Sequence, residues 1–242
     1  MSNFSGKLFI AFMLISINFI GQNLQNDLLV DDSHSSIELK FRPEINRTPL
    51  VLNQSYYIPE LKDSITILKL KFYVSNISFY QSEEFIAQAE QRYFLFDLED
   101  KKSMYRSIVL PNNAEFDNVK FNIGVDSTTQ MKGAQGGDLD PMHGMYWSWQ
   151  SGYVNFKLEG SAKSCPGRNH VFQFHIGGFQ APYNSLQNVH LSFDQKDELI
   201  IMLSLDTLFT QANITQDYKV MSPSERAIGF ADQLPQIFNV KP

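Results

Sequence analysis

The chain contains a single cysteine, Cys165, in 242 residues. A disulfide within the chain is therefore excluded, although an oxidising compartment would permit one. The fold must be held together by its hydrophobic core alone. Because Pro166 and Gly167 follow, we expect Cys165 to lie in a loop with an inert thiol. A reactive thiol and a bridge to a second chain are the alternatives.

Basic clusters are also absent. Lys and Arg number 20 against 26 Asp and Glu, which gives a formal net charge of −6 at pH 7. Nucleic-acid binding needs a basic patch or stripe, so we expect no nucleic-acid partner. After residue 21 no apolar run approaches the about 20 residues that a membrane-spanning helix needs. We therefore expect no transmembrane segment in the mature chain.

The first 21 residues have the pattern of a secretory signal peptide. Lys7 precedes an apolar run that ends at Ile20, and small Gly21 follows. A retained membrane anchor is the alternative, but polar residues interrupt the run. We predict a signal peptide over residues 1–21, cleavage before Gln22, and export to the periplasm or cell surface. The mature chain, residues 22–242, is expected to be one domain.

Hydrophobic residues alternate with polar ones along most of the chain, which is typical of half-buried strands. A phase slip at Leu68 suggests a bulge. Many short strands without alternating helices indicate an all-β fold, an antiparallel β-sandwich of immunoglobulin-like or related type. The segments expected as strands are Ile37–Phe41, Ile65–Val74, Tyr93–Leu98, Val119–Val125, Gly152–Gly160, Val171–Gly178, Asn188–Asp194 and Leu199–Asp206.

Near the C-terminus, a short helix is predicted. Ser222 would be its N-cap, Pro223 its first residue and Glu225 the partner in a capping box, and Pro235 would end it. A weaker helical or loop segment spans 82–92. The longest irregular stretch, 126–142, contains three glycines, and loops of this length are more often functional than idle.

Residues 140–156 concentrate metal-binding and oxidisable side chains. Trp147 and Trp149 are two apart, so on a strand they would share a face, either in the core or as a platform for a sugar. Met142 and Met145 flank His143. Acidic pairs nearby lie in a single loop and support neither glycosidase chemistry nor a dedicated calcium loop.

His143 and His175 could together bind a metal ion. In period-two register, His175 faces away from Phe172 and Phe174. Imidazole suits copper and zinc, and thioether suits Cu(I). The spacing matches no tight zinc signature, so the residues alone leave open whether these histidines are ligands or ordinary surface residues. The remaining histidines, His34, His170 and His190, are expected to be ordinary surface residues.

Several segments resemble the MbnP-like family, which comprises exported bacterial copper-binding proteins of the methanobactin-associated periplasmic type. They follow the family's order and cover nearly the whole mature chain. The segments are "KLKFYVSNISF" (69–79), "FNIGVDS" (121–127), "GDLDPMHGMYWSWQSGYVNFKLEG" (137–160), "FQFHIGG" (172–178) and "MSPSERAIGFADQLPQIF" (221–238).

The resemblance implies a β-rich sandwich and a copper site, expected as Cu(I), in which His143 and His175 match the family's histidines. Met142 or Met145 could add a ligand. It also implies oxidation of one tryptophan to kynurenine by a partner enzyme, a di-haem protein related to cytochrome c peroxidases. Trp147, nearer to His143, is preferred over Trp149.

We therefore expect an exported copper-binding protein for copper scavenging, storage or handover, and not an enzyme. One alternative is a metal-free cell-surface binding module that recognises a glycan or a protein through the Trp/Tyr-rich segment. Another is a structural cell-surface domain in which that segment is merely core.

Overall fold

A computed structural model describes residues 34–150, 152–194, 198–211 and 214–241. The predicted signal peptide and its cleavage site lie outside these residues and remain predictions, as does the extent of the mature domain. Residues Asp32–Pro242 form one compact unit. Among the described helices, none combines the length and apolar composition needed to cross a membrane.

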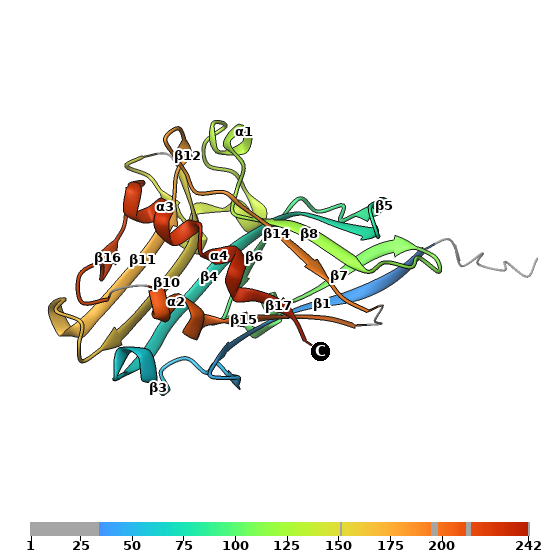
Figure 1. Cartoon of the computed structure of the whole chain (residues 1–242). Coiled ribbons are helices and arrows are strands. Elements are labelled where there is room, and N and C mark those ends of the chain that lie inside the picture. Colours follow the sequence, from blue (N-terminus) through green and yellow to red (C-terminus); the bar gives the residue numbers. More distant parts are fainter. Residues whose placement is uncertain (1–33, 151, 195–197, 212–213, 242) are drawn as a thin grey trace, which may run out of the picture. The chain divides into compact units, whose positions relative to one another are not determined.

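Two β-sheets dominate the described chain (Figure 1). In the smaller, the neighbours β1 and β15 run parallel, whereas β2, β7 and β17 pair antiparallel. The smaller sheet consists of β1 (His34–Ile45), β2 (Thr48–Pro49), β7 (Tyr105–Pro111), β15 (Glu198–Ser204) and β17 (Phe238–Val240).

The larger sheet is built around β4, a long strand that pairs with several shorter ones. Its order is β14-β8-β4-β10-β11-β16, with β3, β5, β6 and β9 attached to these strands. Its strands are β3 (Ser55–Ile58), β4 (Asp63–Gln81), β5 (Glu84–Gln88), β6 (Tyr93–Asp97), β8 (Asn118–Ile123), β9 (Tyr146–Trp147), β10 (Gly152–Ala162), β11 (Val171–Gly177), β14 (Gln187–Ser192) and β16 (Lys219–Val220).

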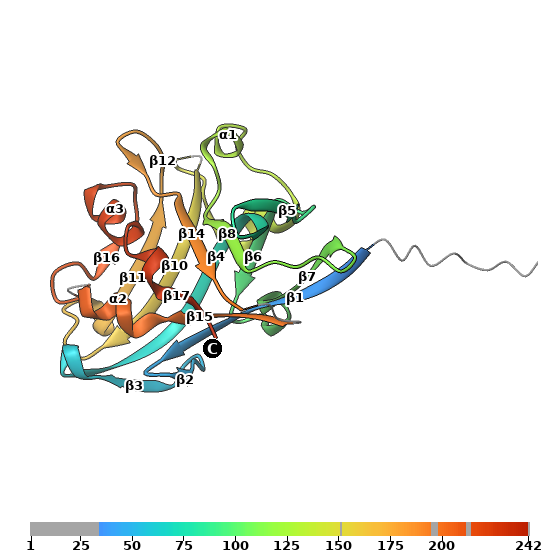
Figure 2. The same ribbon diagram turned by 45° about the vertical axis from the view of Figure 1, so that its right-hand side comes forward.

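Short helices and one hairpin complete the fold. Helices α3 and α4 lie beside β11 and β14 (Figures 1 and 2). The hairpin is β12 (Phe179–Gln180) with β13 (Tyr183–Asn184). The α-helices are α1 (Ser127–Gln130), α2 (Leu205–Gln211), α3 (Glu225–Ala231) and α4 (Leu234–Ile237), and the 3₁₀ turns are η1 (Pro59–Leu61), η2 (Lys101–Met104), η3 (Gly137–Leu139), η4 (Pro141–His143) and η5 (Arg168–His170).

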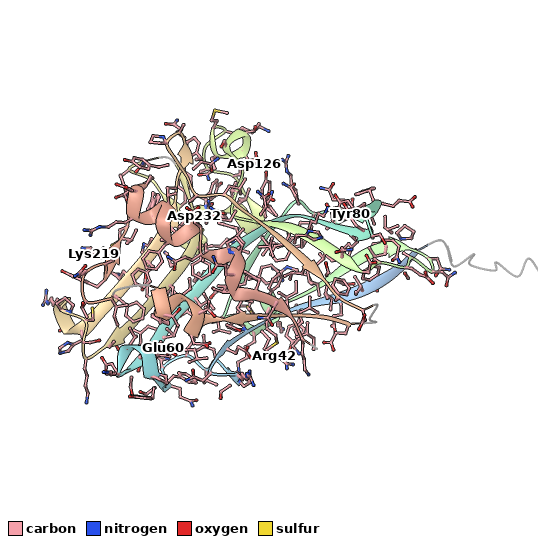
Figure 3. All side chains as sticks on the ribbon, in the orientation of Figure 1. Arg42, Glu60, Tyr80, Asp126, Lys219 and Asp232 are labelled. Atoms are coloured by element: carbon pink, nitrogen blue, oxygen red, sulfur yellow. The ribbon has the colours of Figure 1, made fainter. Side chains whose placement is uncertain are left out.

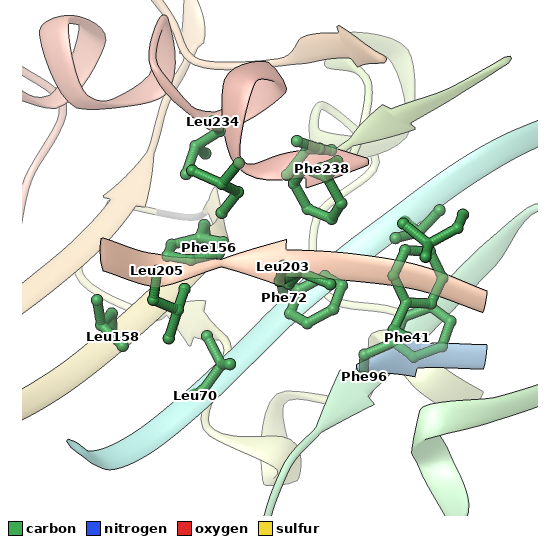
Figure 4. Close-up of a cluster of buried hydrophobic side chains, with 14 of the residues drawn as sticks. Phe41, Leu70, Phe72, Phe96, Phe156, Leu158, Leu203, Leu205, Leu234 and Phe238 are labelled. Carbon is green, nitrogen blue, oxygen red and sulfur yellow. The ribbon is translucent and has the colours of Figure 1, made fainter. Parts of the chain in front are cut away.

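The main core lies between the two sheets. Phe41 of the smaller sheet has its ring centroid 4.4 Å from that of Phe96 and 5.6 Å from that of Phe72, both in the larger sheet (Figure 4). Phe238 of β17 lies 6.1 Å from Phe41. Burying one such ring contributes about 1.5–3 kcal/mol. The expected all-β sandwich is confirmed, with the additional finding that two strand pairs, β1–β15 and β11–β16, are parallel.

The larger sheet is also covered on its outer face. Tyr73 follows Phe72 along β4 and therefore points away from the main core; its hydroxyl donates to the carbonyl oxygen of Asp138 at 3.0 Å. The segment 126–150, which starts at Asp126 (Figure 3), lies over this face. The buried residues of this second cluster are Tyr73, Leu95, Val125, Leu139, Met145, Trp147, Tyr153 and Val154.

The bulge predicted at Leu68 is confirmed. Glu159 of β10 pairs with Lys69, whereas the next residue, Gly160, pairs with Ile67, so Leu68 is the unpaired residue. Ile67 and Leu70 are both buried in the core, whereas Leu68 is exposed. The bulge therefore keeps apolar residues on the core side of β4 both before and after Leu68.

Three local predictions are wrong in detail. Segment 82–92 is not helical: β5 forms a hairpin with β4, and this pairing overrides the helix propensity of its Glu, Ala and Gln residues. The N-cap of α3 is Ser224, which accepts from the amide of Ala227 at 3.2 Å, and not Ser222. Pro235 does not end that helix but lies in the first turn of α4, where its missing N–H leaves no bond unmade.

Candidate metal centre

The candidate site lies on the outer face of the larger sheet. Across three neighbouring strands, Lys71 of β4 pairs with Lys157 of β10, which pairs with His175 of β11. The flanking residues Phe72 and Phe174 point into the main core, so these three side chains share the opposite face. Strand register thus places His175 beside a lysine.

His175 points away from Phe172 and Phe174, as the alternation predicts. This face, however, does not open to solvent: the side chain is only 7% exposed. The segment 126–150 reaches this part of the face, since Lys157, the register partner of His175, donates to the carbonyl oxygen of Gly144. A buried imidazole needs a hydrogen-bonding partner.

Glu159 is that partner. Its Oε1 lies 2.7 Å from Nε2 of His175, two residues from Lys157 on the same face of β10. The hydrogen bond from His175 lowers the pKa of the Glu159 carboxyl, although burial opposes this. An ionised carboxylate only accepts, so Nε2 of His175 donates and the ring is held by this nitrogen. Histidines that ligate metals typically show this arrangement, with the second ring nitrogen held by a carboxylate.

His143 ends the 3₁₀ turn η4. Asp140 caps the turn by accepting from the amide of Met142 at 2.8 Å, and Gly144 ends it in the left-handed region at φ 70°. The His143 side chain is exposed, and its Nε2 lies 3.1 Å from the carbonyl oxygen of Gly137. Nδ1 of His143 is therefore the nitrogen left for a ligand.

Two lysines connect η4 to the sheet. Nζ of Lys71 lies 3.4 Å from the carbonyl oxygen of His143, and Nζ of Lys157 donates to the carbonyl oxygen of Gly144. The backbone of His143 therefore stands over the sheet face that carries His175. The two imidazoles make no hydrogen bond to each other, and each has an acceptor of its own.

The two methionines next to His143 differ in environment. Met142 is 92% exposed, whereas Met145 is fully buried in the second cluster. Met145 packs among the apolar side chains of this cluster. Met142 is the more accessible thioether.

The two tryptophans do not share an environment. Trp147 is 7% exposed and Trp149 is 65% exposed, because β9 ends at Trp147 and a turn follows. A Cβ atom at Gly177 would lie 2.8 Å from the Trp147 ring, which shows how closely the indole covers this glycine. Gly177 is two residues from His175 on β11, so the Trp147 ring lies over the face of this strand from which the candidate ligand projects.

Trp147 also lines a cavity of about 160 Å³. No charged side chain and no histidine line it, so the cavity is separate from the histidine positions. Its walls are Trp147, Gln150, Gly152, Gly178, Phe179, Gln180, Ala181, Tyr183 and Pro223.

The donor set suits a soft ion with few ligands. Among the described residues, no group of three or more His, Cys, Asp or Glu side chains is placed to hold a metal ion. Asp138 accepts from the amide of Leu95 at 2.8 Å, and Asp140 caps η4, so these carboxylates are engaged elsewhere. Imidazole nitrogen is a ligand that suits copper, so the candidate donors are the rings of His143 and His175, each of which has its own acceptor.

The remaining histidines and the cysteine have local roles. His170 and His190 bond Cys165 O and Asn118 Oδ1, each at 3.0 Å. The side chain of His34 is outside the described atoms. Cys165 is 1% exposed and its thiol donates to the carbonyl oxygen of Val171, in line with the inert role expected.

Glu159, Lys71 and Lys157 were missed by reasoning from the sequence. Period-two alternation places Lys157 and Glu159 on one face of their strand. It does not say which residues of β4 and β11 are their neighbours, because strand register is a non-local property.

Comparisons with known proteins agree with this architecture. The MbnP family model matches residues 34–222. Among solved structures, MbnP from Methylosinus trichosporium is similar, with a TM-score of 0.62 and 14% identity, over 86% of this chain and 98% of that chain. At this identity the structural match shows a shared fold. No curated protein matches. Since the family model matches most of the residues of this chain, the chain belongs to the MbnP family.

Proposed function

We propose that this protein is an exported copper-binding protein for copper scavenging, storage or handover, with His143 and His175 as ligands for Cu(I). Membership of the MbnP family supports a copper-related role. The observation that carries the site is the hydrogen bond between His175 and Glu159. It holds a buried imidazole in one orientation through Nε2, which leaves Nδ1 as the nitrogen that we propose for the ligand bond.

Each ligand would bind through Nδ1, because Nε2 of each ring faces an acceptor in the protein. Glu159 fixes the tautomer of His175, and burial keeps water away from its ring. His143, on an exposed turn, would meet the incoming ion first. We propose that the protein is a binding protein and not an enzyme.

Trp147 is our preferred position for oxidation to kynurenine by a di-haem partner enzyme. Its indole packs over Gly177, two residues from His175, so a modified side chain would lie beside the proposed ligand. Trp149, whose ring centroid is 5.7 Å from that of Trp147, is the exposed alternative. Peptides from protein of the native host should show a mass gain on Trp147, and protein made in a foreign host should not.

The second candidate function is a metal-free module that binds a glycan or protein. The uncharged cavity beside Trp147 favours it, because Phe179 and Tyr183 supply rings and Gln150 and Gln180 supply amides. Such walls suit a neutral polar ligand with an apolar face. Metal-free protein that binds glycans, with no affinity for copper, would support this candidate over the first.

The copper proposal is tested by competition for Cu(I) with a chromophoric chelator. His143→Ala and His175→Ala should each strongly weaken binding, since each removes a ligand that water replaces poorly for a soft ion. Glu159→Gln should weaken binding by about tenfold or more, because it leaves the ligand ring unoriented. His190→Ala, an exposed histidine elsewhere, is the control. Wild-type affinity in both ligand variants would refute the site.

A further inference from the structure

Lys157 lies beside the proposed ligand His175 and contacts the residue that follows the other proposed ligand, His143. Its register partners are His175 on one side and Lys71 on the other, and all three side chains project from the outer face. Lys157 belongs to neither the main core nor the second cluster. Burial lowers the pKa of its ammonium group, which shows that the position disfavours charge.

The contact of Lys157 is directed at the turn that carries His143. Its Nζ donates to the carbonyl oxygen of Gly144. Glu159 is the carboxylate nearest along the strand, but it accepts from His175 instead. A half-buried cation needs a strong acceptor to offset its desolvation, and the structure supplies the end of η4.

Lys71 makes a second contact to the same turn. It forms an ion pair with Asp97 at 2.7 Å, and its Nζ lies 3.4 Å from the carbonyl oxygen of His143. Two successive carbonyl groups, of His143 and Gly144, therefore face two ammonium groups of the sheet.

The turn η4 is held internally by the Asp140 cap and by the hydrogen bond between the His143 imidazole and the carbonyl oxygen of Gly137, and the two lysines add contacts to β4 and β10. It comprises three residues, and a 3₁₀ turn of this length has few internal hydrogen bonds. Without the two lysine contacts, the turn and the imidazole that it carries would be freer to shift relative to the sheet. Restricting this motion lowers the entropic cost of binding an ion there.

We propose that Lys157, supported by Lys71, is a positioning residue that fixes the turn carrying His143 over the face carrying His175. The inference rests on the proposed function for its copper consequence, but the anchoring itself is a property of the metal-free chain. Lys157 acts through Gly144 and His143 and does not itself ligate the ion.

The first test uses the metal-free full chain and measures amide hydrogen exchange. Lys157→Met should speed exchange of peptides covering 137–145 and leave those of the main core unchanged. Lys69→Met is the matched control: Lys69 projects from the same face beside Glu159, and no hydrogen bond joins it to the turn. Unchanged exchange at 137–145 in Lys157→Met would overturn the proposal.

The second test measures Cu(I) affinity by chelator competition in a double-mutant cycle. Lys157→Met should weaken binding by about tenfold or more, as changes to groups that orient ligands do. In a His143→Ala background it should have almost no further effect, and Lys157→Arg, which keeps a cationic donor, should restore most of the affinity. An equal loss in both backgrounds would overturn the proposal. If the wild-type chain binds no copper, the proposed function fails, and the exchange experiment alone decides the anchoring.

Discussion

At the scale of single residues, neighbours in the sequence can have opposite environments. Trp147 and Trp149 would share a face on a continuous strand, but the strand ends between them, and one indole is buried while the other is exposed. Gly177 makes the buried position possible, because only a residue without a side chain leaves room for the indole on β11.

Replacing that glycine should therefore disturb Trp147. In Gly177→Ala, the new Cβ would lie 2.6 Å from the carbonyl oxygen of Tyr153 and 2.8 Å from the Trp147 ring. We expect a loss of about 1–3 kcal/mol in the free energy of unfolding, as for other overpacked sites, and a red shift of Trp147 fluorescence in a Trp149→Phe background. Gly136→Ala, where no atom lies within 4 Å of the new Cβ, should change neither.

At the scale of elements, the covering segment 126–150 is tied to the sheet at its first residue. Asp126 is the N-cap of α1 and accepts from the amide of Thr129 at 3.1 Å. Its carboxylate also accepts from the Tyr93 hydroxyl and pairs with Arg92 at 3.2 Å. Burial would raise the pKa of Asp126, but these hydrogen bonds and the nearby guanidinium outweigh it and lower the pKa.

This cap predicts a pH-dependent stability difference. Asp126→Ala should lose about 0.5–2 kcal/mol in the free energy of unfolding at neutral pH. The folded pKa is below the unfolded value of about 3.9, so the contribution is complete above that value and is lost as pH falls through the folded pKa. Urea unfolding at several pH values should show that the free energies of unfolding of the wild type and of Asp126→Ala become equal below about pH 4. Glu90→Ala, an exposed carboxylate, should show no such convergence; a constant difference for Asp126→Ala would contradict the assignment.

At the scale of the whole described unit, the two sheets are joined by aromatic packing. Phe41 is 2% exposed and contacts rings from β4, β6, β8 and β17. With no disulfide available, this core must supply the stability.

Truncating Phe41 tests the importance of that core. Phe41→Ala should reduce the free energy of unfolding by about 3–5 kcal/mol, through lost burial and the cavity left behind. Phe85→Ala, at a position 56% exposed, should stay within about 0.5 kcal/mol of the wild type. Chemical denaturation followed by circular dichroism measures both. A small effect at Phe41 would mean that the core relaxes around the vacancy.

The β-sandwich, most of its strands and the bulge at Leu68 followed from the sequence, because alternation of apolar residues is a local pattern. The sequence also placed His175 on the face opposite Phe172 and Phe174. The strand in segment 82–92 could not be predicted from the sequence, since its pairing with β4 outweighs the helix propensity of its residues.

What the amino-acid sequence determined by itself was therefore which residues point into the core and which family the chain resembles. Only the tertiary structure decided that His175 meets Glu159, that Lys157 reaches the turn of His143, and that Trp147 covers Gly177. Each of these contacts joins segments from different strands or loops. Their meeting depends on strand register and on the folding of segment 126–150 over the outer face, which are set by packing of the whole unit and not by neighbouring residues in the chain.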